Sequence, residues 1–227
     1  MKTHTLRIHK KIKETPHVYS LYLEKDTDPI WNSFIPGQYS TIYLPELNTP
    51  EGKAYSIASH PTEPYVQITV EERGVFSKAL CAHTKGENLH ISSPYGFFYR
   101  EDMSRPVIYI AGGIGVTPFR SMLLDTTNTP PTTELWYSSK TLEESIFKKE
   151  FEQRDIVLHH HITREHVEET ALLHQGRIDI AKHLNTCPQK KTSDFMICGS
   201  ISFVRDMRNN LKAEGIDDMH IYTESFF

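Results

Sequence analysis

Cysteine is scarce in this sequence and is not clustered. The 227-residue chain contains three cysteines, Cys81, Cys187 and Cys198. A scattered, odd-numbered set argues against a disulfide framework and for a reducing compartment. It also excludes a plant-type iron–sulfur centre, which needs closely spaced cysteine ligands. We therefore expect a cytoplasmic protein without an iron–sulfur module.

Long apolar runs and excess positive charge are also missing. No apolar stretch approaches the roughly 20 residues that span a bilayer, and residues 1–13 are too polar for a signal peptide. The formal net charge is −4, so the chain offers no basic field to nucleic acid. With 38% hydrophobic and 24% charged residues, the composition is typical of a soluble globular protein with no nucleic-acid partner and no membrane insertion.

The pattern of the chain changes near residue 102. Before it, short β segments alternate in hydrophobicity and are separated by Pro, Gly and Asn, which predicts an antiparallel β-barrel. The expected strands are 5–11, 18–23, 39–43, 54–58, 66–70 and 88–92, with one helix at 76–83.

After residue 105, strands and helices alternate, which predicts a doubly wound parallel α/β sheet. The expected strands are 107–111, 133–138, 156–162, 194–198 and 219–222, and the expected helices are 117–125, 142–153, 178–185 and 202–214. We therefore predict a two-domain β + α/β protein. Residues 1–101 form the antiparallel β-barrel and residues 102–227 form the doubly wound parallel α/β nucleotide-binding domain.

Two glycine-rich turns each open a predicted helix. Gly112, Gly113 and Gly115 precede Pro118, and a second turn covers residues 74–77. Without Cβ atoms, the backbone N–H groups of such a turn can approach a bulky anion, which the helix N-terminus also favours. The first pattern, Gly-Gly-x-Gly-x-x-Pro, differs from the common dinucleotide pattern Gly-x-Gly-x-x-Gly. A phosphate cradle and a turn without a ligand both remain open for the isolated motif.

Five motifs in order resemble the ferredoxin–NADP reductase family, over residues 6–227. They are Lys53-Ala-Tyr-Ser-Ile-Ala-Ser59, the segment 74–80, Ser93-Pro-Tyr-Gly96, the segment 112–118, and Cys198-Gly-Ser200. The resemblance implies an FAD-binding barrel and an NAD(P)-binding second domain without an iron–sulfur module. Its activity would be NAD(P)H-dependent reduction of FAD, with hydride passing from nicotinamide C4 to flavin N5 in the crevice between the domains.

An external carrier would then take the electrons: a ferredoxin, a flavodoxin or an oxygenase component. Two alternatives stay open. The chain could be a free-flavin reductase that uses FAD or FMN as a substrate, or an electron-transfer subunit that is active only with a partner.

The resemblance also assigns residues to FAD. Tyr55 would stack on the isoalloxazine, and Ser56 would hydrogen-bond near flavin N5 as a catalytic residue. Lys53 stands where the family usually has arginine, so the phosphate grip loses a bidentate fork. The alternatives are cross-strand packing for Tyr55 and backbone pairing for Ser56. The implied FAD-binding residues are Lys53, Ala54, Tyr55, Ser56, Gly74, Val75, Phe76 and Ser77.

In the second domain, the resemblance implies a nicotinamide site. Thr117 would lie next to the nicotinamide, Cys198 beside its C4 atom, and Glu224 close to both rings, so that Cys198 and Glu224 join Ser56 as predicted catalytic residues. The alternatives are a buried small hydrophobe for Cys198 and a solvated tail charge for Glu224. The residues assigned to the cofactors here are Gly112, Gly113, Gly115, Thr117, Pro118, Cys198, Gly199 and, covering the flavin, Phe226 or Phe227.

Two further features bear on ligands. Ser138, Ser139 and Lys140 fall where the family meets the adenosine ribose, and a hydroxyl pair with a cation favours the 2′-phosphate of NADPH, with NADH possible. Arg164 is a second candidate for that contact, and a helix-capping loop at 141–144 is the alternative to a ribose site.

The run His159-His-His161 does not predict a metal site, because consecutive strand residues point to opposite faces. We expect these histidines to be solvated.

Overall fold

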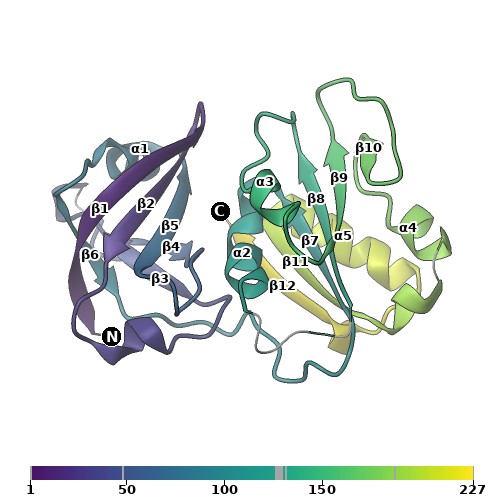
Figure 1. Cartoon of the computed structure of the whole chain (residues 1–227), viewed down its shortest axis with the longest axis horizontal. Coiled ribbons are helices and arrows are strands. Elements are labelled where there is room, and N and C mark those ends of the chain that lie inside the picture. The colour runs from purple at the N-terminus through teal and green to yellow at the C-terminus, as the bar shows by residue number, and fades with distance from the viewer. Residues whose placement is uncertain (1, 48, 126–129, 131, 187, 227) are drawn as a thin grey trace. The chain divides into compact units, whose positions relative to one another are not determined.

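The computed structural model describes residues 2–47, 49–125, 130, 132–186 and 188–226. The chain divides into two compact units. The first comprises Met1–Tyr99 with Thr117–Asp125, and the second comprises Arg100–Val116 with Thr126–Phe227. Figure 1 labels the elements of both. The domain division between residues 101 and 102 stays a prediction, because a compact unit is not by itself an independently folding domain.

The first unit is built on an antiparallel sheet. Its strands pair in the order β4-β3-β6-β1-β2-β5, and a bridge between Ile57 and Ile68 joins the two edges. Joining the edges closes the sheet into a barrel, which confirms the predicted fold. The strands are β1 (Thr3–Thr15), β2 (Val18–Glu24), β3 (Tyr39–Tyr43), β4 (Lys53–Ser56), β5 (Tyr65–Glu71) and β6 (Asn88–Ser92), with helix α1 (Val75–Ala82) and the 3₁₀ turns η1 (Pro29–Asn32) and η2 (Pro45–Leu47).

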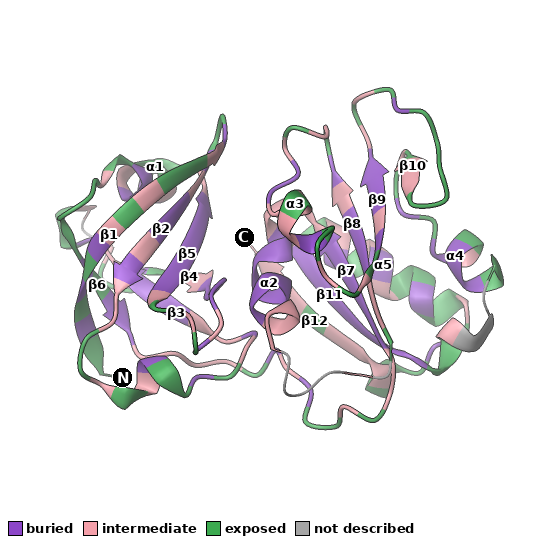
Figure 2. Cartoon of the chain, in the orientation of Figure 1, coloured by how far each residue is buried: buried purple, intermediate pink, exposed green. Residues whose placement is uncertain are grey.

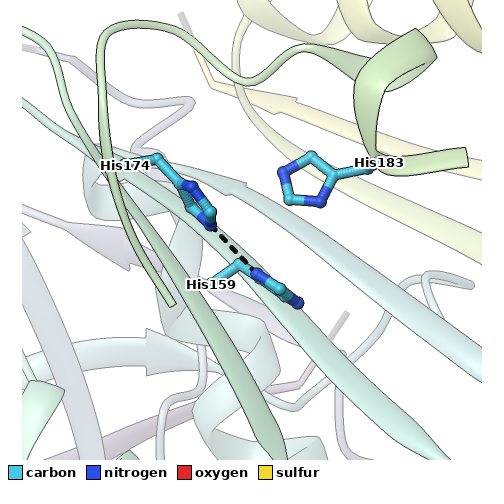
Figure 3. A group of neighbouring side chains, drawn as sticks. All are labelled: His159, His174 and His183. Atoms are coloured by element: carbon cyan, nitrogen blue, oxygen red, sulfur yellow. Dashed lines mark hydrogen bonds between the residues drawn. The ribbon is translucent and has the colours of Figure 1, made fainter. Parts of the chain in front are cut away.

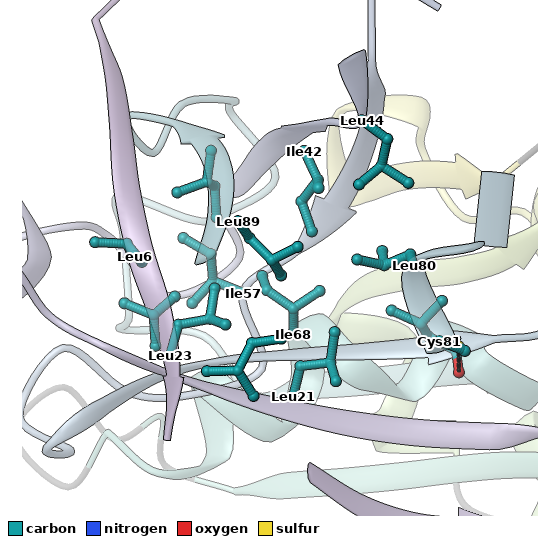
Figure 4. Close-up of a cluster of buried hydrophobic side chains, with 14 of the residues drawn as sticks. Leu6, Leu21, Leu23, Ile42, Leu44, Ile57, Ile68, Leu80, Cys81 and Leu89 are labelled. Atoms are coloured by element: carbon teal, nitrogen blue, oxygen red, sulfur yellow. Dashed lines mark hydrogen bonds between the residues drawn. The ribbon is translucent and has the colours of Figure 1, made fainter. Parts of the chain in front are cut away.

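Alternation along these strands produces the core of the barrel. In β1, Leu6 and Ile8 are buried while the residues on either side of Leu6 face solvent. Leu6, Leu23 of β2, Ile68 of β5 and Leu80 of α1 belong to one buried cluster, which Figure 4 shows. Because side chains alternate between the two faces of a strand, one face of each strand supplies the core.

The second unit is built on a parallel sheet in the order β10-β9-β8-β7-β11-β12. After β7, the chain adds strands first on one side and then on the other. This reversal confirms the predicted doubly wound topology, and it creates a switch point between β7 and β11. The strands are β7 (Val107–Gly112), β8 (Thr133–Ser139), β9 (Val157–Ile162), β10 (Leu173–Gln175), β11 (Asp194–Ser200) and β12 (Ile221–Phe226).

Apolar side chains of this sheet pack against α4 and α5. Ile110 of β7 and Ile197 of β11 form one buried cluster with Leu184 of α4 and Leu211 of α5. Figure 2 shows β7 and β11 buried along most of their length, as expected for central strands of a parallel sheet. The helical elements are η3 (Gly113–Val116), α2 (Thr117–Leu123, in the first unit), α3 (Lys148–Phe151), α4 (Ile180–Thr186), η4 (Pro188–Thr192), α5 (Ile201–Ala213) and η5 (Asp218–His220).

One expected helix is wrong. Residues 142–153 were predicted to be helical, but only α3 forms there. Thr141 Oγ1 does accept the Glu144 N–H at 3.2 Å, so the predicted cap exists. Phe147, however, has a φ of 61°, in the left-handed region that interrupts a right-handed helix. The short edge strand β10 was not predicted at all.

Candidate functional site

Several predicted site residues meet at the carboxyl ends of β7, β11 and β12. Cys198 lies opposite Ala111 of β7 on one side and opposite Glu224 of β12 on the other. Two residues further along, Ser200 lies opposite Phe226. This edge is the switch point of the sheet, where open α/β folds bind their ligands. The parallel register thus brings together residues that are about 25 positions apart in the sequence.

Burial controls the protonation of two of these groups. The Cys198 side chain is buried, and burial, together with the charge of Glu224, raises the pKa of its thiol well above the ordinary value. Burial also raises the pKa of the Glu224 carboxyl. Cys198 therefore stays a neutral thiol and is unsuited to act as a nucleophile, because the thiolate is the reactive form.

The glycines at the switch point have two different roles. A Cβ on Gly115 would lie 2.2 Å from the Cys198 carbonyl oxygen, and a Cβ on Gly112 would lie 2.9 Å from the Phe203 ring. A Cβ on Gly113 would meet nothing within 4 Å, although its φ of +55° favours glycine. Gly112 and Gly115 are thus explained by packing, whereas Gly113 leaves open space that a ligand could fill.

The predicted pyrophosphate turn is divided by the structure. Gly112, Gly113 and Gly115 belong to the second unit, whereas Thr117 and Pro118, the first residues of α2, belong to the first. Both Thr117 and Pro118 are buried. The assignment of these residues to NAD(P)H stays a prediction.

Of the two residues predicted to lie at the adenosine ribose, Ser139 is buried and Lys140 is exposed. The Ser139 hydroxyl is buried and lies 2.7 Å from Ser145 Oγ and 2.9 Å from His160 Nε2. Lys140 is exposed, and its Nζ lies 3.3 Å from a carboxylate oxygen of Glu144. The Ser139 hydroxyl is therefore engaged inside the unit. Lys140 and Arg164 are both exposed, and the Arg164 N–H donates to the Lys140 carbonyl at 2.8 Å, so the two candidate cations for a 2′-phosphate are neighbours.

In the first unit, β4 carries the predicted flavin residues. Lys53 and Ala54 are exposed, Tyr55 is half-buried and Ser56 is buried. The Tyr55 ring stacks against Phe76 of α1, with centroids 6.4 Å apart and planes at 24°. Burial, and secondarily the charge of Cys81, raises the pKa of the Tyr55 hydroxyl, so that it stays protonated. Tyr55 thus packs against a helix rather than across a strand, on a ring that is still partly exposed.

The turn before α1 is organised by Ser77. Its hydroxyl accepts the N–H groups of Arg73 and Gly74 at 2.9 and 3.1 Å. A Cβ on Gly74 would meet nothing within 4 Å. The helix amides of Val75 and Phe76 belong to the first turn, whose N–H groups have no intrahelical acceptor. These amides and the space at Gly74, rather than the Ser77 side chain, are what the turn offers to an anion.

Sequence reasoning missed the residues that hold the end of the Lys53–Ser59 motif. Arg120 Nη1 donates to the Ala58 carbonyl at 2.8 Å and contacts Glu63 Oε2 at 3.0 Å. Ser121 Oγ donates to the Ser59 carbonyl at 2.6 Å. These residues of α2 lie 62 positions from their carbonyl partners, and no local pattern in the sequence signals such a contact.

The expectation of solvated histidines at 159–161 is wrong. His160 and His161 are each 3% exposed, and His159 is half-buried. His160 faces Ser139 and Ser145, whereas His161 Nε2 lies 2.9 Å from His183 Nε2 of α4. Consecutive histidines do point to opposite faces, but His159 and His161 share one face.

Phe227, predicted to cover the flavin, lies outside the described residues.

Known proteins are similar to this chain in sequence. The family model of the oxidoreductase NAD-binding domain matches residues 109–209. Flavohemoprotein from Bacillus cereus is 29% identical over 239 residues, covering 96% of this chain and 59% of the relative. The chain thus spans about three-fifths of the length of the curated relatives that it matches.

Solved structures share the fold over the whole chain. A ferredoxin NADP+ reductase from Neisseria gonorrhoeae, solved with FAD and NADP bound, has 19% identity and a TM-score of 0.82, with 100% of each chain covered. The flavohem-like FAD/NAD-binding domain of nitric oxide dioxygenase from Vibrio cholerae has 24% identity and a TM-score of 0.78, with 98% of each chain covered. This shared fold confirms the two-domain architecture that the sequence predicts, and the family model matches an oxidoreductase NAD-binding domain within the second unit.

Proposed function

We propose that this chain, which has the two-domain fold of the ferredoxin–NADP reductase family, is an FAD-containing NAD(P)H oxidoreductase. When bound, the two cofactors would supply the redox chemistry, with hydride passing from nicotinamide C4 to flavin N5 and electrons then passing to an acceptor. The residues of this chain bind and orient the cofactors. That division of labour is consistent with a site whose buried cysteine is a neutral thiol.

The observation that carries the proposal is the convergence at the switch point. Cys198 and Glu224 lie on adjacent strands at the carboxyl edge of the sheet, next to the β7 end that leads into the glycine turn. The match to the oxidoreductase NAD-binding domain spans this edge from Tyr109 through Cys198. We assign Cys198 to shaping the nicotinamide pocket and Glu224 to providing a polar group there.

The first unit contains features that fit FAD. The open space at Gly74 and the first-turn amides of α1 suit a diphosphate, and the partly exposed Tyr55 ring suits stacking on a flavin. Lys53 is exposed at the start of β4, available to a phosphate but without the fork of arginine. We therefore propose FAD as the bound flavin, held less firmly than an arginine would hold it.

We propose NADPH as the preferred donor, with NADH as the alternative. Lys140 is an accessible cation near the expected ribose position, beside the exposed Arg164, and the Glu144 carboxylate partly offsets the charge of Lys140. Replacing Lys140 with alanine should raise KM for NADPH about tenfold and leave KM for NADH within about twofold. Glu144→Ala is the matched control and should lower KM for NADPH. Equal effects of Lys140→Ala on both nucleotides would contradict NADPH preference.

The acceptor is proposed to be an external carrier: a ferredoxin, a flavodoxin or an oxygenase component. The relatives' name, flavohemoprotein, adds a haem-containing acceptor to those worth testing. The described residues contain no helix long and apolar enough to cross a membrane. We keep the cytoplasm as the proposed location because the cysteines are few and scattered.

A spectrum of the purified protein before and after addition of NADPH or NADH tests the proposal. We expect a yellow protein that keeps its flavin through gel filtration and is bleached by the nucleotide under anaerobic conditions. A colourless protein that reduces added FAD or FMN would instead support a free-flavin reductase. An FAD-loaded chain that fails to reduce ferricyanide with NAD(P)H would support a subunit that needs a partner.

A further inference from the structure

Four histidines gather beside β9 and β10, at the lateral edge of the parallel sheet opposite to β12. His160 is level with Cys198 in the strand register, but β8 and β7 lie between β9 and β11. His159 and His161 lie on the same face of β9, since they are two residues apart. His174 of β10 lies opposite His161 in the parallel register, and α4 contributes His183. The His183 ring stacks on Trp136 at 4.4 Å. Three elements thus bring their imidazoles to one place.

Three of these side chains have the spacing of a metal-ligand set. One nitrogen from each of His159, His174 and His183 lies within 4.8 Å of the others. Figure 3 shows His159 Nδ1 facing His174 Nε2, which are 3.1 Å apart, with His183 beside them. Ligand nitrogens of a tetrahedral zinc ion are about 3.3 Å apart, because Zn–N bonds are about 2.0–2.1 Å. Small side-chain rotations would therefore complete the geometry.

The chemistry of the cluster also suits a metal. Histidine ligates a metal ion through a neutral ring nitrogen. Imidazole nitrogen is a preferred ligand for zinc and other late transition metals. His159 and His174 are half-buried, so an ion has access from solvent.

Two observations show how the neighbours would support such an ion. Glu134 Oε2 lies 3.7 Å from Nε2 of His159, the ring nitrogen that does not face His174. This separation is longer than a hydrogen bond, so the carboxylate places negative charge beside the ring without fixing its orientation. Among the described side chains, Nδ1 of His161 is buried without a hydrogen-bond partner, so the apo cluster leaves a polar atom unsatisfied. Two described lysines act on the cluster: Lys190, whose ammonium is paired with Glu134 at 2.8 Å, and Lys182 of α4, which acts on His174.

We propose that His159, His174 and His183 bind one zinc ion, with water or His161 in the fourth position. The ion would join β9, the short edge strand β10 and helix α4. Its role is structural, because the ligands lie on the scaffold of the second unit and none is a predicted cofactor contact. Binding to the folded state alone would stabilise that state.

Zinc titration of the tag-free 227-residue chain, after removal of metal with a chelator, tests the site. By calorimetry we expect one zinc ion per chain and a Kd below about 1 µM. His174→Ala should weaken binding at least about 100-fold, the upper end of what losing even an orienting partner causes. His166→Ala is the matched control, because His166 is an exposed histidine of the same unit, and it should bind zinc like the wild type.

Thermal unfolding gives a second readout. Zinc should raise Tm of the wild type and of His166→Ala, and should leave Tm of His174→Ala unchanged. His183 is buried against Trp136, so its alanine variant can fail to fold; His174→Ala and His174→Gln, at a half-buried position, keep the test decisive. Wild-type binding no tighter than that of His174→Ala, or an equal loss in His166→Ala, would overturn the proposal and leave a packed histidine cluster.

Discussion

The barrel of the first unit and the parallel sheet of the second bury polar groups in different ways. Inside the barrel, Ser20, Gln67 and Thr69 form a network of neutral groups, with Ser20 Oγ 2.9 Å from Thr69 Oγ1. In the second unit, Asp194 at the start of β11 is 3% exposed and accepts from Arg100 at 2.8 Å. Removing one member of a neutral network lowers the free energy of unfolding by a modest amount. Removing one member of an ionic network lowers it more, because a buried charge is left without its partner.

The largest expected effect tests this difference directly. Asp194 also lies 3.0 Å from Arg105 Nε and 2.9 Å from His220 Nδ1. Asp194→Ala should therefore lower the free energy of unfolding by about 3–5 kcal/mol, measured by urea denaturation. Thr69→Val in the barrel network should cost only about 0.5–1.5 kcal/mol. An equal loss of unfolding free energy in the two variants would contradict the difference between the ionic and the neutral network.

The glycines extend the comparison from polar groups to packing. Gly115→Ala in the second unit should cost about 1–3 kcal/mol, because its Cβ would collide with the Cys198 carbonyl oxygen. Gly74→Ala in the first unit should leave the free energy of unfolding of the FAD-free protein almost unchanged, because its Cβ meets open space. It should instead reduce FAD retention on gel filtration. Full FAD retention by Gly74→Ala would argue against a diphosphate at this turn.

A smaller effect is expected at Ser56, the predicted flavin contact of the barrel. Ser56 is buried at the end of β4, and losing one hydrogen bond costs about 0.5–1.5 kcal/mol, or about 2- to 13-fold in rate. Stopped-flow measurement of flavin reduction should show Ser56→Ala slowed by this factor with its fold intact. Ser33→Ala, at an exposed serine of the same unit, serves as the control. An unchanged rate in Ser56→Ala would remove that residue from the flavin site.

The smallest effect concerns pH and Glu224 of the second unit. Because burial raises its folded-state pKa above the unfolded value, the folded protein binds the proton more tightly. Stability from this group is therefore full below the unfolded pKa of about 4.3 and is lost as pH rises through the folded pKa. Glu224→Gln should be more stable than the wild type at pH 8 and equal to it near pH 4. A wild type favoured at pH 8 would contradict the assigned burial effect.

Local patterns were enough to predict most elements of both units. Alternation such as that of Val18-Tyr-Ser-Leu-Tyr-Leu23 marks barrel strands, and the apolar run before Gly112 marks a central parallel strand. The helix expected at 142–153 failed because the capping motif at Thr141 is local, whereas the left-handed Phe147 ends the pattern within two turns. A cap signal identifies where a helix could begin, not how far the chain continues it.

The candidate sites also have features that the local sequence shows and features that only distant contacts decide. The glycine turns were visible in the sequence, but which glycines pack and which face open space depends on Phe203 and Cys198, about 80 to 90 residues away. Likewise, a strand period of two gave the opposite faces of His160 and His161, but it carried no information on His174 or His183. The histidines are buried because other elements cover them. The strand pattern alone does not show those elements, so the histidines were expected to be solvated.

By itself, the sequence determined the order of strands and helices, the two kinds of sheet and the positions of the glycine turns, because these depend on residues close together in the chain. The tertiary structure alone decided that Cys198 faces Glu224, that Ser77 and Ser139 are used inside their own units, and that His159, His174 and His183 meet. These outcomes depend on strand register and burial, which are set by contacts between distant segments.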